Sequence, residues 1–340
     1  AAGRDHGADL VHPGYGFLSE DADFAADCAA AGLTFVGPDP RVLRTFGDKV
    51  SARAAAVAAG VPVPAATASA IDEAGAAEFL AGHPGGVMIK AVAGGGGRGI
   101  RPVTTARQLS QVFGICAAEA RAAFGNGDLF VEELLPAARH IEVQVVAAPD
   151  NDGGTTALAI GDRDCSVQRG RQKLIEVAPA QWLDDDLRAA LHRAAVELIA
   201  GGGYRGLATV EFLVTADRFV FLEVNPRIQV EHTVTEEVTG VDLVEVGLRI
   251  AQGATIAELL LPQGMAANGG VVSGAGARAC GVAIQTRGNN QAGAPAGAPA
   301  AGAGKILQPV QIKSSRKTVD ESGLRYFASQ NQQKRVEKEI

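Results

Sequence analysis

The chain has 340 residues, of which 47% are hydrophobic and 20% charged, and its formal net charge is −7. These values predict a globular protein of two or three domains and argue against nucleic-acid binding. The sequence contains no signal peptide and no apolar run of membrane length, so we expect a cytoplasmic protein without a membrane partner. The four cysteines lack CxxC spacing, which indicates neither a disulfide framework nor a zinc site.

The N-terminal segment, residues 8–36, predicts a strand, a glycine-containing loop, a helix and a second strand. We expect Ser19 to cap a helix from Glu20 to Ala31, which Gly32 ends. This pattern is half of a doubly wound α/β unit, and the elements that normally precede it are missing, so we expect a fragment. Glu20 is compatible with a cap, a salt-bridge partner or a site residue, and we favour a structural role.

Residues 39–59 predict one long alanine-rich helix that carries Lys49. A lysine at the end of an apolar helical face can reach a nucleotide as a point charge. Taken alone, however, Lys49 is better explained as a surface lysine. Gly60, Pro62 and Pro64 then mark a boundary.

From residue 65 to residue 134 the pattern is that of a compact α+β unit. A strand over residues 87–90 ends in Lys90, and a run of glycines follows it. Backbone N–H groups of such a run can surround phosphate oxygens, while Lys90 meets the α- and β-phosphates. No GK[ST] follows and the loop joins two strands, which disfavours a P-loop NTPase; a flexible loop is the alternative. The run consists of Gly94, Gly95, Gly96 and Gly97.

Residues 129–135 predict an apolar strand that can offer backbone groups to an adenine ring. Leu135 would pack on the ring and Glu132 would make a polar contact. In the next strand, residues 139–145, the alternation predicts a shared face for His140, Glu142 and Gln144. Residues 168–173 then form a basic, amide-rich loop that suits a carboxylate or a phosphate, and residues 184–201 predict an amphipathic helix.

Two acidic residues are predicted to meet across a pair of strands. Glu211 lies in the strand 207–214, and Glu223 lies in the strand that begins at Phe219, after a short turn. Asn225 adds a third oxygen on the same face as Glu223. Hard oxygen ligands of this kind suit Mg²⁺ or Mn²⁺ held against phosphates.

Polar residues continue at every second position through the segment 218–236: Glu223, Asn225, Arg227, Gln229 and Glu231. If the chain stays extended, these side chains point the same way. Arg227 and Gln229 offer planar donors to a small oxyanion, and Glu231 is then free to act as a base. A solvated strand face is the alternative, which the density of polar groups disfavours.

Two lysines, a glycine-rich lid and paired acids are together the components of an ATP-grasp ligase. The motifs HPGYGFLSE, FGDKVSAR, IKAVAGGGGRGIR, RHIEVQV, DRDCSVQR and FLEVNPRIQVEHTVTE make the pattern more specific. Over residues 8–252 the sequence resembles biotin carboxylase, the ATP-grasp component of biotin-dependent carboxylases. The resemblance implies an α/β and α+β architecture, namely an ATP-grasp fold with a partial Rossmann-like N-terminal domain.

The resemblance also implies a division of the chain into five segments. They are a remnant of the Rossmann-like domain (1–37), a helical linker (38–64), the ATP-grasp lid (65–134), an incomplete C-terminal catalytic domain (135–290) and a low-complexity polar tail (291–340).

The resemblance assigns roles to residues of three sets. The implied ATP-binding set is Lys49, Lys90, Gly94, Gly95, Gly96, Gly97, Glu132, Leu135, His140 and Gln168. The implied metal set, for two Mg²⁺ or Mn²⁺ ions, is Glu211, Glu223 and Asn225. Arg227, Gln229 and Val230 would bind bicarbonate, Glu231 would remove its proton, and Arg287 would stabilise the biotin enolate.

The function implied is the ATP-dependent carboxylation of biotin by bicarbonate through carboxyphosphate, the first half-reaction of an acyl-CoA or pyruvate carboxylase. The implied partners are a biotin carboxyl carrier domain, a carboxyltransferase and a second copy of the chain as a homodimer. Two alternatives stay open: another ATP-grasp ligase of the carbamoyl-phosphate-synthetase kind, and a fragment that binds nucleotide without turnover.

Three departures from the family pattern stand out. Gly170 removes a side-chain donor from the loop 168–173. The missing first elements of the Rossmann-like domain should leave an exposed sheet edge. After Arg287, an Ala/Gly/Pro repeat at residues 291–304 replaces the acidic segment and closing strands expected there.

Overall fold

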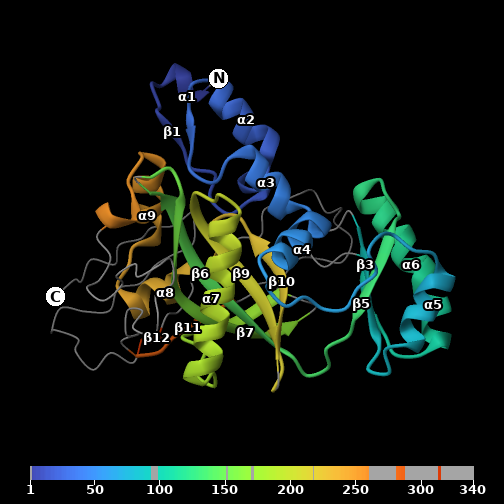
Figure 1. Ribbon diagram of the computed structural model, residues 1–340. Coiled ribbons are helices and arrows are strands. Elements are labelled where there is room, and N and C mark those ends of the chain that lie inside the picture. Colours follow the sequence, from blue (N-terminus) through green and yellow to red (C-terminus); the bar gives the residue numbers. More distant parts are fainter. Residues whose placement is uncertain are drawn as a thin grey trace, which may run out of the picture.

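Three sheets organise the residues that the computed structural model describes, which are 2–92, 99–150, 152–169, 172–216, 218–259, 281–287 and 313–314 (Figure 1). One sheet belongs to an N-terminal unit (residues 2–35) and one to the segment that we call the lid (residues 73–133). The largest sheet carries most of the apolar core. The predicted glycine run Gly94 to Gly97, Gly170, and the expected tail apart from residues 313–314 lie outside the described residues.

The N-terminal unit contains a pair of short parallel strands. The predicted cap at Ser19 is wrong, because the chain makes a 3₁₀ turn there and Asp21 caps the helix, accepting hydrogen bonds from the backbone N–H groups of Asp23 and Phe24. Aspartate caps a helix as well as serine does. The elements are α1 (Ala2–Asp5), β1 (Leu10–Val11), η1 (Phe17–Ser19), α2 (Ala22–Ala30) and β2 (Thr34–Phe35).

The single helix predicted over residues 39–59 is wrong, because the chain breaks at Asp48 into α3 (Pro40–Gly47) and α4 (Lys49–Ala58). The backbone of Asp48 is extended, with φ −96° and ψ 123°. Its N–H closes α3 on the carbonyl of Arg44, and its side chain caps α4 by accepting from the N–H of Ser51. Lys49 is therefore the first residue of a helix rather than part of the end of one.

The lid is an antiparallel sheet of order β4-β3-β5 covered by two helices on one face (Figure 1). In the central strand, Val87, Ile89 and Ala91 are buried against the helices. Strand alternation turns Met88 and Lys90 to the other face, where they line a cavity. The elements are α5 (Glu73–Ala81), β3 (Val87–Ala91), β4 (Ile100–Val103), α6 (Ala106–Phe124) and β5 (Leu129–Glu133).

The seven-stranded sheet has the order β10-β9-β6-β7-β8-β11-β12 and is antiparallel throughout. Its elements are β6 (Arg139–Pro149), β7 (Thr155–Arg169), β8 (Gln172–Ala178), α7 (Asp185–Gly201), β9 (Gly206–Val214), β10 (Phe219–Asn225), α8 (His232–Thr239), α9 (Leu243–Ala251), η2 (Ile256–Glu258), β11 (Ala283–Thr286) and β12 (Lys313–Ser314).

Alternation along β6 places the polar site on one face of this sheet. Ile141, Val143 and Val145 pack in the core cluster that contains α7. The opposite face of β6 bears the predicted polar residues and continues as Val146, which packs in the cluster that contains α9. The polar groups are therefore held between an apolar core beneath the strand and an apolar cluster at its end.

Candidate active site

A cavity of about 800 Å³ lies between the lid and the seven-stranded sheet. This volume is typical of a pocket for a nucleotide-sized ligand. Apart from the glycine run, every residue that the sequence analysis assigned to a site lines it. These residues are Lys49, Lys90, Glu132, Leu135, His140, Gln168, Glu211, Glu223, Asn225, Arg227, Gln229, Val230, Glu231 and Arg287.

The lid contributes an ion pair to one wall of the cavity. Lys90 of β3 pairs with Glu132 of β5, and both side chains are largely buried. Their strands are neighbours, with Lys90 opposite Phe130 and Met88 opposite Glu132. The lid thus presents one cation and one anion, surrounded by the apolar side chains of Met88, Ile100 and Phe130.

Lys173 of β8 is the central cation on the opposite wall. Its ammonium donates hydrogen bonds to Glu142, to Glu211 at 2.8 Å and to Glu231 at 2.8 Å. Burial alone would lower the pKa of Lys173, but these carboxylates outweigh burial and raise it well above the ordinary value. The sequence placed Lys173 in a basic loop and gave no sign that it joins three acids from three different elements.

Arg163 of β7 lies beneath this cluster and is fully buried. Its guanidinium donates to Glu142, to the amide oxygen of Gln144 at 3.0 Å and to Thr235 of α8 at 2.7 Å. Arg163 therefore connects the floor of the site to α8. Sequence reasoning missed this role, and its one signal was the position of Arg163 within the DRDCSVQR motif.

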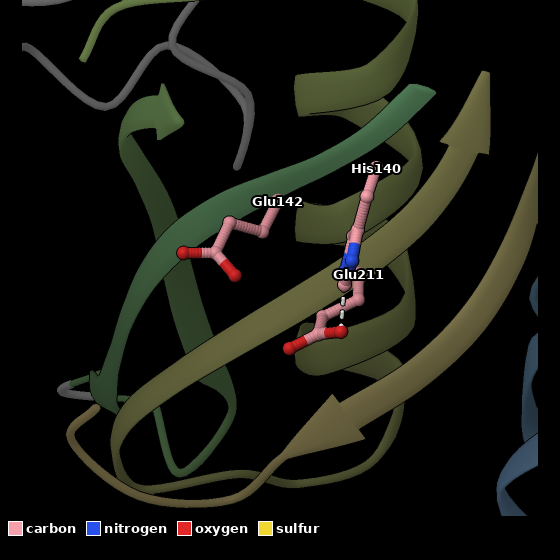
Figure 2. A group of neighbouring side chains, drawn as sticks. All are labelled: His140, Glu142 and Glu211. Carbon is pink, nitrogen blue, oxygen red and sulfur yellow. Dashed lines mark ion pairs between the residues drawn. The ribbon is translucent and has the colours of Figure 1, made fainter. Parts of the chain in front are cut away.

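Figure 2 shows His140, Glu142 and Glu211, three side chains of β6 and β9 whose ligand atoms lie close together. The imidazole Nε2 of His140 lies 2.5 Å from Oε2 of Glu211. Burial alone would lower the pKa of His140, but the charge of Glu211 more than compensates and raises it. Lys173 pairs with both Glu142 and Glu211, so a cation of the protein occupies the position that a metal ion between these two carboxylates would take.

Glu211 and Glu223 are directly opposite each other in the β9–β10 pair, as the sequence predicted. The oxygens of Glu211 are bonded, since Oε1 also accepts from Asn225 at 2.9 Å and from Gln229 at 3.2 Å. The pKa of Glu223, in contrast, is raised by burial and then by the charge of Glu211. A cation bound beside Glu223 and Asn225 would remove this repulsion, so the residues present fit a divalent metal ion.

The condition under which the five alternating residues would share a face, a chain that stays extended, is not met beyond Asn225. The strand ends there, residues 226–231 turn, and α8 begins at His232. Because the turn folds back over the sheet, the later polar residues nevertheless line the same cavity. Proline at position 226 is compatible with this ending, since it cannot donate to a further strand.

Arg227 is held by the N-terminal unit. Its Nε donates to Oε1 of Glu20 at 2.6 Å, and its Nη2 donates to Oδ1 of Asn225 at 3.1 Å. Glu20 is thus a salt-bridge partner, one of the three roles that the sequence allowed. Through this pair the N-terminal unit reaches the side chain predicted to bind an oxyanion.

Glu231 has a cation on each oxygen. Oε1 accepts from Lys173, and Oε2 accepts from Nη2 of Arg287 at 2.7 Å. Burial alone would raise the pKa of Glu231, but Lys173, Arg287 and Arg163 outweigh it and lower the pKa to about 2. Glu231 is therefore ionised throughout the neutral pH range.

Two family models match the chain. Residues 48–259 match "Carbamoyl-phosphate synthase L chain, ATP binding domain", and residues 1–43 match "Biotin carboxylase, N-terminal domain". The chain belongs to the biotin carboxylase family of ATP-grasp proteins. The resemblance stated from the motifs and the expected fold class are both confirmed.

Similar curated proteins are pyruvate carboxylases. The chain is 48% identical to the mitochondrial enzyme of Rattus norvegicus over 262 residues and 48% identical to pyruvate carboxylase 1 of Caenorhabditis elegans over 260 residues. These matches cover 76% of this biotin carboxylase family chain and 22% of each relative. The chain therefore spans about a fifth of the length of those proteins.

Similar solved structures are carboxylases too. A single-chain, multi-domain long-chain acyl-CoA carboxylase is 53% identical with a TM-score of 0.70, and the match covers 84% of this chain and 25% of that one. The biotin carboxylase domain dimer of Hydrogenobacter thermophilus 2-oxoglutarate carboxylase is 36% identical with a TM-score of 0.74, over 84% of this chain and 60% of that one. In the part of the chain that the structure describes, none of the helices combines the length and apolar character needed to cross a membrane.

Proposed function

We propose that this chain carries the biotin carboxylase site of a larger biotin-dependent carboxylase, which transfers the carboxyl group of bicarbonate to biotin at the expense of ATP. The observation that supports the proposal most is the convergence in one cavity of two lysines, a facing pair of acids, an oxyanion-binding arginine and the Glu231–Arg287 pair. Each of these groups has a use in this reaction. A generic nucleotide pocket needs only the lysines and the facing pair of acids.

The part of the cavity next to the lid would hold ATP. Lys49 and Lys90 would bind its phosphates together with the glycine run, and Glu132, Leu135, His140 and Gln168 would surround the nucleoside. The related Hydrogenobacter thermophilus structure contains MgADP and bicarbonate according to its description. Glu211, Glu223 and Asn225 would hold Mg²⁺ or Mn²⁺, which supplies positive charge to the phosphates when bound.

Arg227, Gln229 and the backbone of Val230 would bind bicarbonate beside Glu231. Glu231 would accept the bicarbonate proton while a bicarbonate oxygen attacks the γ-phosphate, giving ADP and carboxyphosphate. Carboxyphosphate then breaks down to CO₂ and phosphate, the phosphate removes the ureido proton of biotin, and the biotin nitrogen bonds to CO₂. Arg287 would stabilise the enolate that forms.

The charge around Glu231 sets a condition on the proton transfer. A carboxylate with a pKa near 2 is a weak base, because Lys173 and Arg287 favour its ionised form. Glu231 becomes a stronger base when one of these cations turns to another anion. Bicarbonate is an anion that would bind beside Glu231, so substrate binding itself would draw positive charge away from Glu231 and raise its basicity.

The proposal includes partners that act outside this chain: a biotin carboxyl carrier domain, a carboxyltransferase that selects the acyl-CoA or keto acid, and a second copy of the chain. The description of the Hydrogenobacter thermophilus relative names a dimer. A cytoplasmic location is also part of the proposal, although several relatives are named as mitochondrial.

A ligase of the carbamoyl-phosphate-synthetase kind is the second candidate, since the model that matches residues 48–259 carries that name. The two functions differ in their dependence on biotin. A carbamoyl-phosphate-type ligase needs ammonia as the acceptor, whereas a biotin carboxylase accelerates ATP turnover when biotin is added.

The test is ADP release from MgATP in bicarbonate, measured with and without free biotin, for the 340-residue chain. We expect biotin to stimulate turnover and Glu231→Gln to abolish the stimulation, whereas the control Glu245→Gln, an exposed residue of α9, keeps it. Stimulation by ammonia and not by biotin would favour the second candidate. Nucleotide binding without turnover under every condition would overturn the proposal for this chain.

A further inference from the structure

The guanidinium of Arg287 lies between two buried carboxylates from different elements. Its Nη2 donates to Glu231, which precedes α8, at 2.7 Å. Its Nε lies 2.6 Å from Oε1 of Glu176 in β8. The backbone N–H of Arg287 donates to the carbonyl of Leu174, so Arg287 directly extends the pairing of β11 with β8. The two acids thus bind different nitrogens of the same guanidinium.

Glu176 differs from the other acids of the site in its bonding. Within the described residues, neither of its oxygens accepts a hydrogen bond of acceptable geometry, although its side chain is fully buried. The side chain of Gln285 lies opposite it on β11, is also buried, and leaves its Nε2 without an acceptor. Glu142, Glu211 and Glu231 each accept two or more hydrogen bonds.

A buried carboxylate that lacks hydrogen-bond donors costs stability rather than contributing to it. Glu176 therefore does not serve the fold by hydrogen bonding, and its charge acts on the cation it faces, Arg287. The site already provides Glu231 as one anionic partner for that arginine. Glu176 is the anion that remains beside Arg287 when the charge of Glu231 is lost.

We propose that Glu176 is a positioning residue that holds Arg287 at the biotin subsite after Glu231 has accepted the bicarbonate proton. The inference rests on the proposed function of the cavity. Once Glu231 is neutral, its attraction for the guanidinium falls, and Glu176 is the anion that keeps Nε of Arg287 in place. Without Glu176, the side chain of Arg287, which is 21% exposed, can leave the biotin subsite and pair with the phosphate group instead.

The charges around Glu176 agree with such an exchange. Burial raises the pKa of Glu176 to about 7; Arg287 and Lys173 lower it, whereas Glu231 and Glu142 raise it. Protonation of Glu231 removes one of the raising charges, so Glu176 ionises more completely at the moment when its charge is needed. Glu176 then carries the negative charge next to Arg287 while Glu231 is neutral.

The test compares Glu176→Gln, which keeps the shape and removes the charge, with Glu176→Asp, which keeps the charge. We expect Glu176→Gln to lower biotin-dependent ADP release about ten-fold or more relative to ADP release without biotin, since mispositioned catalytic groups cost up to about a hundred-fold. Glu176→Asp should recover part of the loss. The exposed Glu245→Gln variant serves as the control and should match the unmodified chain.

The proposal would be overturned if the ratio of ADP release with biotin to ADP release without biotin were the same for Glu176→Gln and the unmodified chain. Equal losses in Glu176→Gln and Glu176→Asp, which would indicate packing and not charge, would also overturn it. If the unmodified chain shows no biotin stimulation, the proposed function fails first, and a second measurement then decides the pairing itself.

This second measurement is a double-mutant cycle that combines Glu176→Gln with Arg287→Met. Unfolding in denaturant at about pH 8 is monitored by circular dichroism. If Arg287 is the cation that neutralises Glu176, then Glu176→Gln raises the denaturation midpoint more in the Arg287→Met chain than in the unmodified chain. Equal shifts in the two backgrounds would show that the residues are not coupled and would overturn the inference regardless of activity.

Discussion

Glu211 and Glu223 face each other in register, yet their surroundings give the two carboxylates opposite effects on stability. Glu211 receives hydrogen bonds from Lys173, Asn225 and Gln229. Burial alone would raise its pKa, but Lys173 and His140 outweigh burial and hold the pKa well below the ordinary value. Burial and the charge of Glu211 raise the pKa of Glu223. The first acid is thus stabilised by its neighbours, and the second is destabilised.

We therefore predict opposite results for two chemically identical substitutions. Glu211→Gln leaves Lys173 and His140 with one fewer buried anion and should lower the free energy of unfolding by about 3 kcal/mol or more. Glu223→Gln removes a repulsion and should raise it by about 1 kcal/mol. Chemical denaturation of the metal-free protein measures both values. A loss of stability in Glu223→Gln would contradict this account of the acid pair.

Glu176 leads to a prediction about pH. Its pKa rises from the ordinary value of 4.5 to about 7 in the folded protein, so the folded state binds an additional proton between these limits. Stability from this group is therefore complete below about pH 4.5 and is lost as the pH rises through about 7. The shift corresponds to at most about 3 kcal/mol.

Consequently, Glu176→Gln should be more stable than the unmodified chain at about pH 8 and equally stable at about pH 5. Urea denaturation at the two pH values checks the difference. Glu245→Gln is the control, because that exposed side chain should change neither value. A pH-independent effect of Glu176→Gln would show that Glu176 does not titrate in this range.

At the scale of elements, the sequence predicted which segments are strands and helices better than it predicted where they end. The alternation in residues 207–214 and 139–145 located β9 and β6 because it is a local property of the chain. The break at Asp48 was missed because the apolar positions of residues 40–47 and the alanine-rich residues 49–58 both fit a helical pattern. Only the backbone angle of Asp48, a single local event, separates α3 from α4.

The same limit applies to the site. Asn225 and Arg227 were identified from the sequence because polar residues are unusually dense in the segment that contains them. The structure places both in the cavity wall. Lys173 and Glu176 were not assigned, because their partners lie on strands and loops far away in sequence. An ion cluster that joins β6, β8, β9 and the residue before α8 has no local signature.

The cap of α4 gives a prediction at this scale. Asp48→Ala removes the hydrogen bond to the N–H of Ser51, and the first turn, which carries Lys49, should fray. We expect a loss of about 1 kcal/mol in stability together with a several-fold weaker affinity for ATP, measured by denaturation and by nucleotide titration.

Asp72→Ala is the matched control, since Asp72 caps α5 of the lid by one hydrogen bond to the N–H of Gly75, and α5 contributes no residue to the cavity wall. It should lose similar stability and keep its affinity for ATP. A similar loss of ATP affinity in both variants would mean that general stability, and not the position of Lys49, controls nucleotide binding.

At the scale of the whole molecule, the cavity depends on three units that are separate in the chain. The lid supplies Lys90 and Glu132, the large sheet supplies the ion cluster, and the N-terminal unit supplies Tyr15 and the carboxylate of Glu20. Figure 1 shows the lid and the N-terminal unit as distinct bodies beside the seven-stranded sheet. Contacts between units therefore determine whether the site is complete.

The Glu20–Arg227 pair tests this dependence. Glu20→Gln removes the anion that pairs with Nε of Arg227 and leaves the hydrogen bonds to Asn225 and to the carbonyl of Ile228, so the orientation of the arginine toward the oxyanion becomes less fixed. Because the pair is partly exposed, we expect a modest effect of about 1 kcal/mol, or roughly a five-fold rise in the KM for bicarbonate. The KM for ATP should change less than two-fold, since the ion pair of Glu20 within the described residues is with Arg227, which belongs to the bicarbonate set.

Asp23→Asn is the control within the same unit. Asp23 pairs with Arg44 at 2.8 Å, but both side chains are largely exposed, and neither lines the cavity. Exposed pairs contribute little, so this variant should match the unmodified chain in both kinetic constants. If Glu20→Gln also matches it, the N-terminal unit contributes no orientation to Arg227, and the oxyanion subsite is completed by the large sheet and the turn after Asn225 alone.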